Sequence, residues 1–395
     1  MGRGSNVIWN PYTTGYFENP YPHLAQCRAE NPVQIGSHGS WMIFRHEDVS
    51  KILRSNDYLV SDLSAYFAEK EPYIFKSSPE SCPYLSKATR QWPMYLNGEH
   101  HRKVRTAIAR AFSSLEIDPI IEKALHITTP QFNAKSTFDL VDYCSSFILE
   151  VIKGVFNISN EHYLQELRHY SNLLAKSQDL FVPKQVYVEI NDKLLWGKEL
   201  FPKSDFRAIL ESSMDGEGLS SDDLYSLLAI SLMAAFETSK DNLSLALLEL
   251  MKSEELIEST QSTQAESQNL LIEELLRFSS PLQYTVRVNK FDTSVGSATI
   301  PANSKVYLCL ASANRDPEAF KEPNTVFPHR NPNPHLSFGG GQHFCLGASI
   351  ARAEMRQCLK PMTLFLANYE PIEAQQKWSK QIFMRTASAL PLKKK

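Results

Sequence analysis

Apolar residues recur at the spacing of an α-helix through most of the chain beyond residue 102. The pattern predicts helices over 102–113, 117–127, 139–155 and 160–176. The glycine-rich run at 215–218 breaks this pattern, and the serines and aspartates that follow it favour a new helix start. That next helix, over 221–251, is apolar on nearly every side through its first half, which is typical of a helix at the centre of a protein.

Strand-like segments are few and short. Apolar residues with β preference near 33–35 and 40–44 lie between two predicted helices. Alternating residues over 285–310 follow a strong helix over 268–279. Residues 181–205 combine aromatics, lysine and proline, and their pattern supports no assignment. We therefore expect a mainly α fold with small β-sheets.

Composition and charge narrow the class of protein. The 395 residues are 43% apolar and 22% charged, which is typical of a globular protein with a large core. The net charge of −3 gives no general attraction to nucleic acid or to anionic membranes. The longest apolar stretch, 227–236, is too short to span a bilayer. We expect a soluble, cytoplasmic monomer with no nucleic-acid or membrane partner.

We expect no export signal in the first residues of the sequence. Met1 to Ser5 lack the apolar core of a signal peptide and have the composition of an expression-tag remnant. We treat residues 1–18 as an N-terminal extension and residues 19–395 as a single domain.

The cysteines are scattered, and one of them stands apart. Residues 27, 82, 144, 309, 345 and 358 form no C-x-x-C pair, which argues against a zinc site, an iron–sulfur site or a disulfide framework. Cys345 ends a glycine-rich loop directly before a helix-forming run over 348–366. The positive end of the helix dipole and nearby N–H donors favour the thiolate there, which is the form that binds metal. Three glycines at 339–341 let the backbone approach a large flat surface.

The loop over 338–347 fits the string F-G-x-G-x-H-x-C-x-G at every fixed position. It resembles the haem-binding loop of the cytochrome P-450 family, of the soluble bacterial type. The resemblance implies that Cys345 is the axial metal ligand of a haem b, iron protoporphyrin IX, with Phe338 and Gly339 in contact with the cofactor. It implies a single-domain fold, a triangular helical prism with the haem between a long central helix and the helix after Cys345.

Glu274 and Arg277 lie three apart on a predicted helix, in the pattern E-x-x-R. Alone, such a pair is usually a solvated ion pair of small value. The resemblance assigns both residues, together with Arg330, to a structural triad that holds the cysteine loop on its helix.

Glu237 and Thr238 lie within the apolar central helix, where an acid is costly unless it has a partner or a function. One interpretation is a salt-bridged or capping glutamate beside a threonine that bonds back to the preceding turn. The other is a catalytic proton relay that serves oxygen chemistry. The resemblance favours the relay, since A-G-x-[DE]-T matches here with Ala235 in place of the usual glycine.

A haem carries two propionates, which need cationic or hydrogen-bonding partners. By resemblance five residues match family positions with this role: His101, Arg105, Arg287, His335 and His343. Each one alone is more often an ordinary surface or core residue, but they occur in the order that the family requires.

Basic residues recur every fourth position on the helix after Cys345 and share one face: Arg352, Arg356 and Lys360. Arg102, Lys103 and Arg110 could extend this face. It is either a solvated helix surface or a docking patch for an acidic electron donor such as a ferredoxin.

The candidate walls of a substrate pocket are mostly apolar: Met94, Leu96, Ile230, Met233, Ala234, Leu282 and Met384. They are equally good core residues. If they line a pocket, a medium-sized hydrophobic substrate is expected, such as a terpenoid, steroid, fatty acid or polyketide-like compound. We expect residues 181–205 to belong to an access lid.

The resemblance covers nearly the whole chain and implies a haem-thiolate monooxygenase. Such an enzyme takes O2 and two electrons, supplied by NAD(P)H through a ferredoxin reductase and a ferredoxin, and hydroxylates or epoxidises its substrate. A role in secondary metabolism is expected. Two alternatives stay open: a peroxide-driven haem-thiolate oxygenase or peroxidase, and a non-catalytic haem sensor.

Overall fold

The protein is described by a computed structural model, which covers residues 7–36, 39–60, 82–158, 160–180, 182–200 and 204–395. The chain divides into two compact units, each assembled from separate segments. The first, called the β-rich unit here, contains Met1–Ser61, Leu248–Cys345 and Gln375–Ala389. The second, called the helical unit, contains Asp62–Leu247, Leu346–Ala374 and Leu390–Lys395.

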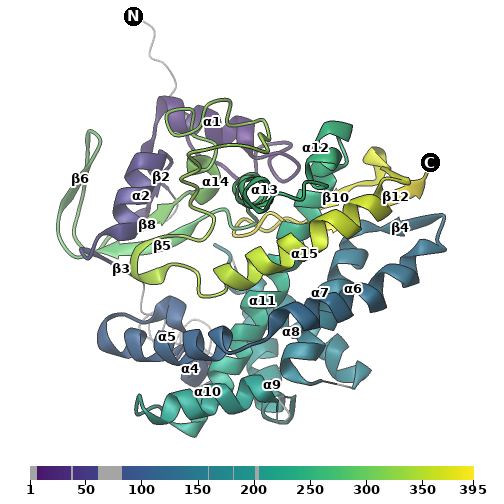
Figure 1. The fold of residues 1–395 in the computed structure, drawn as a ribbon. Coiled ribbons are helices and arrows are strands. Elements are labelled where there is room, and N and C mark those ends of the chain that lie inside the picture. The colour runs from purple at the N-terminus through teal and green to yellow at the C-terminus, as the bar shows by residue number, and fades with distance from the viewer. Residues whose placement is uncertain (1–6, 37–38, 61–81, 159, 181, 201–203) are drawn as a thin grey trace, which may run out of the picture. The chain divides into compact units, whose positions relative to one another are not determined.

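A five-stranded sheet organises the β-rich unit (Figure 1). Its strand order is β1 (Val33–Ile35), β2 (Trp41–Ile43), β8 (Lys305–Leu308), β5 (Thr285–Asn289) and β3 (Tyr58–Leu59). Neighbouring strands are antiparallel except for β2 and β8. Val49, Ile52 and Leu53 of α2 (His46–Arg54) are buried in one core with sheet residues. Because α2 has its apolar residues on one face, it covers the sheet and keeps its charged residues in solvent.

Shorter elements complete this unit. They are α1 (Tyr21–Glu30), α12 (Glu254–Ser259), α13 (Ala265–Phe278), α14 (Leu310–Ala313), the hairpin of β6 (Thr293–Val295) and β7 (Ala298–Ile300), the 3-10 turn η3 (Gly341–His343), and β10 (Lys377–Trp378) paired with β11 (Ala387–Ala389).

The helical unit contains most of the long helices (Figure 1). They are α4 (Pro83–Thr89), α5 (Gly98–Ser113), α6 (Ile117–Asn133), α7 (Leu140–Phe156), α8 (Glu161–Lys176), α9 (Lys184–Leu200), α10 (Asp205–Asp215), α11 (Ser221–Leu250, up to Leu247 in this unit) and α15 (Ala348–Leu366). A three-stranded sheet adds β4 (Thr137–Asp139), β12 (Pro391–Lys394) and β9 (Tyr369–Pro371) in that order.

Local chemistry explains where α7 begins and how closely it packs. The Asp139 carboxylate accepts from the N–H of Val141 at 2.8 Å and so caps the helix, which ends at Asn157 in a left-handed conformation. The same carboxylate accepts from the N–H of Leu390 at 3.0 Å, which ties the last strand to this helix start. A Cβ on Gly154 would lie 2.5 Å from Ile120, so the glycine permits the close approach of α6 and α7.

The predicted mainly α fold with small β-sheets is confirmed. The predicted helices over 102–113, 139–155, 160–176, 221–251 and 268–279 match α5, α7, α8, α11 and α13 within a few residues at each end. The helix over 117–127 is longer than predicted, because α6 continues through Pro130 to Asn133.

Residues 181–205, which had no assignment, contain α9 and the first residue of α10. The expected tag remnant, Met1 to Ser5, lies outside the described residues. Among the residues that are described, no helix combines the length and the apolar character needed to cross a membrane.

Candidate active site

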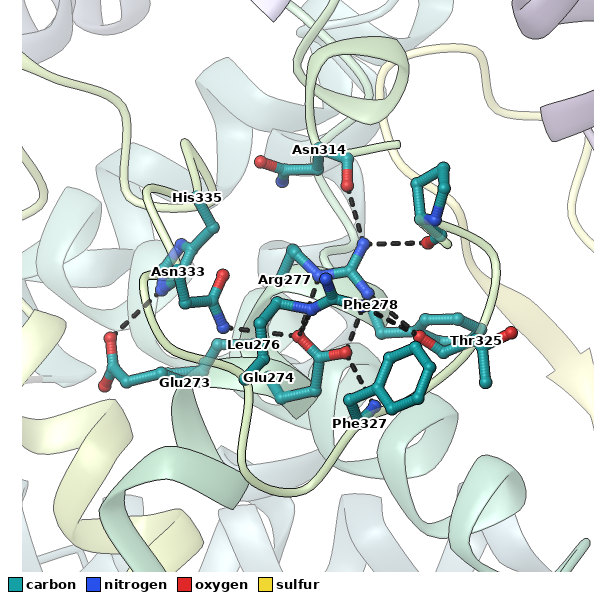
Figure 2. A network of polar contacts seen from close by, with 12 residues as sticks. Glu273, Glu274, Leu276, Arg277, Phe278, Asn314, Thr325, Phe327, Asn333 and His335 are labelled. Atoms are coloured by element: carbon teal, nitrogen blue, oxygen red, sulfur yellow. Dashed lines mark hydrogen bonds and ion pairs between the residues drawn. The ribbon is translucent and has the colours of Figure 1, made fainter. Parts of the chain in front are cut away.

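A buried ionic network in the β-rich unit joins α13 to the loops after α14. Glu274 and Arg277 lie one turn apart, and two hydrogen bonds of 2.8 Å run from the guanidinium to the carboxylate. Arg330 donates from Nε to the same carboxylate at 2.9 Å. Figure 2 shows Glu274 surrounded by Arg277, Phe327 and Asn333. The three residues of the expected triad are therefore in direct contact.

Backbone carbonyls satisfy the remaining donors of the two arginines. Arg277 Nη1 donates to the carbonyls of Asn314 and Pro323, both at 2.8 Å. Arg330 Nη1 donates to the carbonyl of Lys321 at 2.8 Å. Buried charges are tolerated when they are paired and hydrogen-bonded in this way. The network consequently fixes the irregular segment 314–330 onto α13.

Cys345 differs from the other cysteines in its exposure. All six cysteines are described, and Cys345 is exposed while the other five are buried. Its N–H donates to the carbonyl of Phe338 at 2.9 Å, which closes the loop shortly before α15 begins. Burial raises the pKa of the thiols of Cys27, Cys144 and Cys309 to about 11 or 12, which keeps them protonated. Only Cys345 offers an accessible sulfur in a loop of fixed shape.

The glycines of this loop serve two different purposes. Gly341 has a φ of 63°, and a Cβ there would overlap the carbonyl oxygen of Leu53 on α2. A Cβ on Gly340 would lie 3.3 Å from the Leu53 side chain. Packing against α2 therefore requires glycine at position 341, whereas a side chain at position 340 would need Leu53 to move by a few tenths of an ångström. Gly339 has a φ of 68°, and a Cβ there would meet only the backbone oxygen of His343, at 3.7 Å. The loop is therefore not crowded at Gly339.

Arg287 is a buried cation on β5. The residue is 4% exposed, and burial lowers the pKa of its guanidinium to about 10. Its Nη1 donates to the hydroxyl of Thr285 at 3.2 Å and to the carbonyl of Val286 at 2.8 Å. Within the described part of the chain, no carboxylate forms an ion pair with it. A buried guanidinium without a counter-ion fits an anionic group such as a propionate.

The two histidines near the loop differ in their contacts. His335 is nearly buried, its Nε2 lies 3.0 Å from Glu273, and its Nδ1 accepts from the N–H of Ser337 at 3.3 Å. A propionate would have to replace one of these partners. His343 lies half-buried at the end of η3.

The other two propionate candidates, His101 and Arg105, lie one turn apart on α5 in the helical unit. His101 is 3% exposed and Arg105 is half-buried. The structure therefore places the five predicted propionate partners on α5, on β5 and around the cysteine loop.

Glu237 on α11 is ion-paired. Lys240, one turn further along, donates to its Oε2 at 2.6 Å, and the same ammonium lies 3.4 Å from Asp241. All three side chains are less than 10% exposed. Burial alone would lower the pKa of Lys240, but Asp241 and Glu237 raise it above its ordinary value. Glu237, the acid of the expected relay, thus has the Lys240 ammonium beside it. This is the salt-bridged glutamate of the first interpretation.

Thr238 lies on the least buried turn of the same helix. Its hydroxyl donates back to the carbonyl of Ala234. Ala234 is exposed and Ala235 half-buried, whereas α11 is otherwise buried over most of its length. The Thr238 hydroxyl and the ion-paired Glu237 are adjacent in sequence. Because the residue at position 234 is a small alanine, a small molecule can reach this turn.

An acid that sequence reasoning missed lies on α15. Glu354 is 6% exposed, and the Ser239 hydroxyl of α11 donates to its Oε2 at 2.7 Å. Burial raises the pKa of Glu354 to about 7, although the bond from Ser239 lowers it in part. A signal was present in the sequence, because Glu354 lies between apolar residues of α15 that are themselves buried, Ala353 and Met355.

The pocket candidates fall into two groups. Met94 and Leu96 are half-buried around the 3-10 turn η2 (Pro93–Tyr95), and Ile230, Met233 and Ala234 follow one another along α11, all in the helical unit. In the β-rich unit, Leu282 pairs with Met384 through an isolated bridge. Leu282 also packs against the sheet core, which is the alternative that the sequence left open for it.

The basic residues of α15 remain on its surface. Arg356 and Lys360 are exposed, and Arg352 is half-buried. On α5, by contrast, acids accompany the basic residues: Arg102 and Lys103 lie 3.7 and 3.6 Å from Glu99, and Arg110 lies 3.4 Å from Glu217. The three basic residues of α5 that could extend the predicted face are therefore paired with acids.

Comparison with known proteins identifies the class. The family profile described as "Cytochrome P450" matches residues 199–395. The chain is 27% identical over 380 residues to the "Biotin biosynthesis cytochrome P450" of Bacillus subtilis (strain 168), covering 90% of this chain and 92% of that protein. It is 26% identical over 368 residues to the "Epothilone C/D epoxidase" of Sorangium cellulosum, covering 88% and 85%.

Solved structures agree with this result over nearly the whole chain. P450BioI in complex with acyl carrier protein ligated to hexadec-9Z-enoic acid has a TM-score of 0.84 at 25% identity, covering 96% of this chain and 99% of that one. Epothilone B-bound P450epoK has a TM-score of 0.84 at 23% identity, covering 98% and 100%. The chain belongs to the cytochrome P450 family of haem-containing monooxygenases, enzymes that incorporate an atom of molecular oxygen into their substrates.

Proposed function

We propose that this protein is a monooxygenase that binds haem b through Cys345 and hydroxylates or epoxidises a medium-sized hydrophobic molecule in secondary metabolism. The single observation that carries the proposal is the exposed thiol of Cys345 in a closed glycine-rich loop, in a chain whose other five thiols are buried. When bound, the haem supplies the oxygen-activating chemistry.

The residues around the cofactor receive separate roles in this proposal. Arg287 binds one propionate, because it is a buried cation without a carboxylate partner among the described residues. His101, Arg105, His335 and His343 are the further candidates for propionate contacts, while Phe338 and Gly339 line the loop. Glu274, Arg277 and Arg330 act structurally, by holding the segment that precedes the cysteine loop.

The absorption spectrum of the reduced carbon-monoxide complex tests the ligand assignment. The wild type should show the red-shifted Soret band of a thiolate-bound haem, and Cys345→Ser should lose it. Cys358→Ser, which changes a buried thiol on the following helix, is the matched control and should keep the band. A band that persists in Cys345→Ser would show that Cys345 is not the ligand.

Thr238 and Glu237 are proposed to handle the protons of the reaction. The Thr238 hydroxyl lies on the accessible turn of α11, and Glu237 next to it is an ion-paired carboxylate. In Thr238→Ala we expect reductant and oxygen still to be consumed while product falls and hydrogen peroxide is released, because protons no longer arrive in the right place. If the fraction of consumed electrons that is recovered in product stayed the same in this variant, Thr238 would not belong to the relay.

A peroxide-driven oxygenase and a haem sensor are the competing functions. The presence of the acid and hydroxyl at 237 and 238 supports the oxygen-dependent route, since neither competitor requires them. Turnover with hydrogen peroxide should be compared with turnover with ferredoxin, ferredoxin reductase and NAD(P)H. Faster turnover with peroxide alone would favour the peroxide-driven oxygenase. Binding of a small molecule without turnover in either system would favour the haem sensor.

The exposed basic face of α15 is proposed to bind an acidic donor of the ferredoxin type. Arg356→Glu combined with Lys360→Glu should slow reduction by ferredoxin about tenfold or more at low ionic strength, because the field that steers association is reversed. Lys377→Glu with Lys380→Glu makes the same change of charge in the other unit and should leave the rate unaltered. Equal rates in the two double variants would reject this surface.

The substrate class is proposed from the apolar residues at 94, 96, 230, 233, 282 and 384. A titration of the ferric protein with terpenoids, steroids, fatty acids and polyketide-like compounds, both free and linked to a carrier protein, should produce a spin-state shift with the best ligands. If only polar compounds produced this shift, the assignment of an apolar pocket would be wrong.

A further inference from the structure

A histidine attaches the segment before the cysteine loop to α13. Nε2 of His335 lies 3.0 Å from a carboxylate oxygen of Glu273, a contact that Figure 2 shows. The other ring nitrogen, Nδ1, accepts from the N–H of Ser337 at 3.3 Å. The neutral ring with its proton on Nε2 satisfies both contacts, because Nδ1 is then free to accept. The histidine side chain is only 5% exposed, so both contacts are shielded from water.

Ser337 links this histidine to the loop that carries the proposed metal ligand. Its hydroxyl donates to the carbonyl of Leu276 on α13 at 2.8 Å, which holds the serine in place. The next residue, Phe338, accepts from the N–H of Cys345 at 2.9 Å through its carbonyl. All of these residues belong to the β-rich unit. A continuous series of hydrogen bonds, with one peptide bond, therefore joins the acid on α13 to the backbone of Cys345.

The same contacts make His335 a poor partner for a haem propionate. A propionate needs a donor, and the one N–H of the neutral ring is already directed at Glu273. An anion at this nitrogen would have to displace that carboxylate or lie beside it, where the two like charges repel each other. Arg287 has no such conflict, because its described partners are a hydroxyl and a backbone carbonyl.

We propose that His335 is a positioning residue for the Cys345 ligand rather than a propionate partner, and that Glu273 fixes its orientation and its tautomer. This inference deepens the proposed function, because it rests on Cys345 as the haem ligand. Contacts behind a metal ligand fix its orientation, and their loss typically weakens metal binding. Four of the five candidates for the propionates then remain: His101, Arg105, Arg287 and His343.

Hydrogen exchange of the intact haem protein, resolved by mass spectrometry with fragmentation, tests the series of contacts. His335→Phe removes both ring nitrogens but keeps a ring, and Glu273→Met removes the acceptor at similar length. The amide protons of Ser337 and Cys345 should exchange about tenfold faster in both variants, because a lost hydrogen bond loosens the segment. His329→Gln, at an exposed position shortly before this segment, is the matched control and should exchange like the wild type. Unchanged exchange in Glu273→Met would overturn the proposal, because a propionate partner does not need this acid.

The reduced carbon-monoxide complex tests the consequence for the ligand. On mild warming, the thiolate Soret band should disappear about five to ten times faster in His335→Phe and in Glu273→Met than in the wild type. The double variant should lose it no faster than the faster single variant, because the two side chains act through one contact. His335→Asn should recover part of the lifetime, since its side-chain oxygen can still accept from the N–H of Ser337. Wild-type lifetimes in both single variants, or effects that multiply in the double variant, would overturn the proposal.

These outcomes can be separated from failure of the proposed function. If Cys345→Ser keeps the thiolate band, the ligand assignment fails whatever His335 does. If Cys345→Ser loses the band while Glu273→Met matches the wild type in both measurements, the proposed function stands and the positioning role of His335 is rejected. Should His335→Phe fail to fold, Glu273→Met is compared with Glu273→Gln, which keeps an oxygen that can accept from Nε2. Glu273→Gln should then lie closer to the wild type, and wild-type behaviour of both variants would overturn the proposal.

Discussion

Glu274 and Glu354 are both buried glutamates, yet their neighbours suit them to opposite purposes. Glu274 is fully buried and accepts five hydrogen bonds, three of them from the guanidiniums of Arg277 and Arg330. Glu354 is 6% exposed and accepts one described bond, from a neutral hydroxyl. Burial alone therefore does not set the role of an acid. Paired cations make it a fixed structural charge, whereas a lone hydroxyl leaves its proton exchangeable.

Removing the charge of Glu274 should have the largest effect on stability. Glu274→Gln leaves two buried guanidiniums without a counter-charge, and we expect a loss of about 3–5 kcal/mol in the free energy of unfolding. Denaturant unfolding followed by circular dichroism measures this loss. Glu266→Gln, at an exposed position in the first turn of the same helix, is the control and should change stability by less than about 0.5 kcal/mol. Similar losses in the two variants would contradict the structural role of the network.

Glu354→Gln should have an effect that depends on pH. The pKa of Glu354 is raised in the folded protein, from 4.5 to about 7. Between these values the folded state holds a proton that the unfolded state has lost, so wild-type stability falls as pH rises through this window and is level on either side of it. The variant has no such proton. The wild-type advantage over the variant should therefore shrink by roughly 3 kcal/mol from pH 4.5 to 7.

Unfolding of both proteins at several pH values provides the measurement. The difference between wild type and variant cancels the titration of all other groups. A difference that is constant with pH would show that Glu354 exchanges no proton in this range, and the contrast with Glu274 would disappear.

Two glycines of the cysteine loop should differ in how much stability is lost when each is replaced by alanine. Gly341→Ala combines a left-handed backbone with overlap on the Leu53 carbonyl, so we expect a loss of about 1–3 kcal/mol. Gly339→Ala has the same backbone strain without the overlap and should lose only about 1 kcal/mol. Thermal unfolding of the two variants measures the difference. Equal losses would mean that packing on α2 adds nothing to the requirement for glycine.

Thr238→Ala should change stability least. The Thr238 hydroxyl bonds back to a backbone carbonyl on a partly exposed turn, so its removal should alter the free energy of unfolding by less than about 0.5 kcal/mol. The same variant should strongly increase peroxide release. A large loss of stability would indicate a structural role for this hydroxyl and would weaken its assignment to proton transfer.

Much of the fold followed from local pattern. Apolar periodicity located α5, α7, α8, α11 and α13, because these helices each present an apolar face, or in α11 a nearly complete apolar surface, to the core. Residues 181–205 resisted assignment although they contain α9, a helix whose buried residues include Tyr187 and Ile190. Its apolar residues follow no regular spacing, so tertiary contacts with α4 and α8 decide its structure.

The candidate site followed from motifs only in part. The triad residues were predicted, and the structure places them in one network. The predicted reason for three successive glycines was incomplete, since packing against α2 is a separate reason for glycine at position 341. The Ser239 partner of Glu354 was not predictable, because a glutamate within a helix carries no local signal of what will face it from another helix.

The family, the helical character and the position of one special thiol followed from the sequence, because each of these depends on local spacing along the chain. Only folding brought the Ser239 hydroxyl to Glu354. Glu237 meets Lys240 on its own helix, whereas Glu354 meets Ser239 across 115 positions of sequence. The physical reason is that the charge state of a buried carboxyl depends on the groups within a few ångströms of it, and folding brings those groups together.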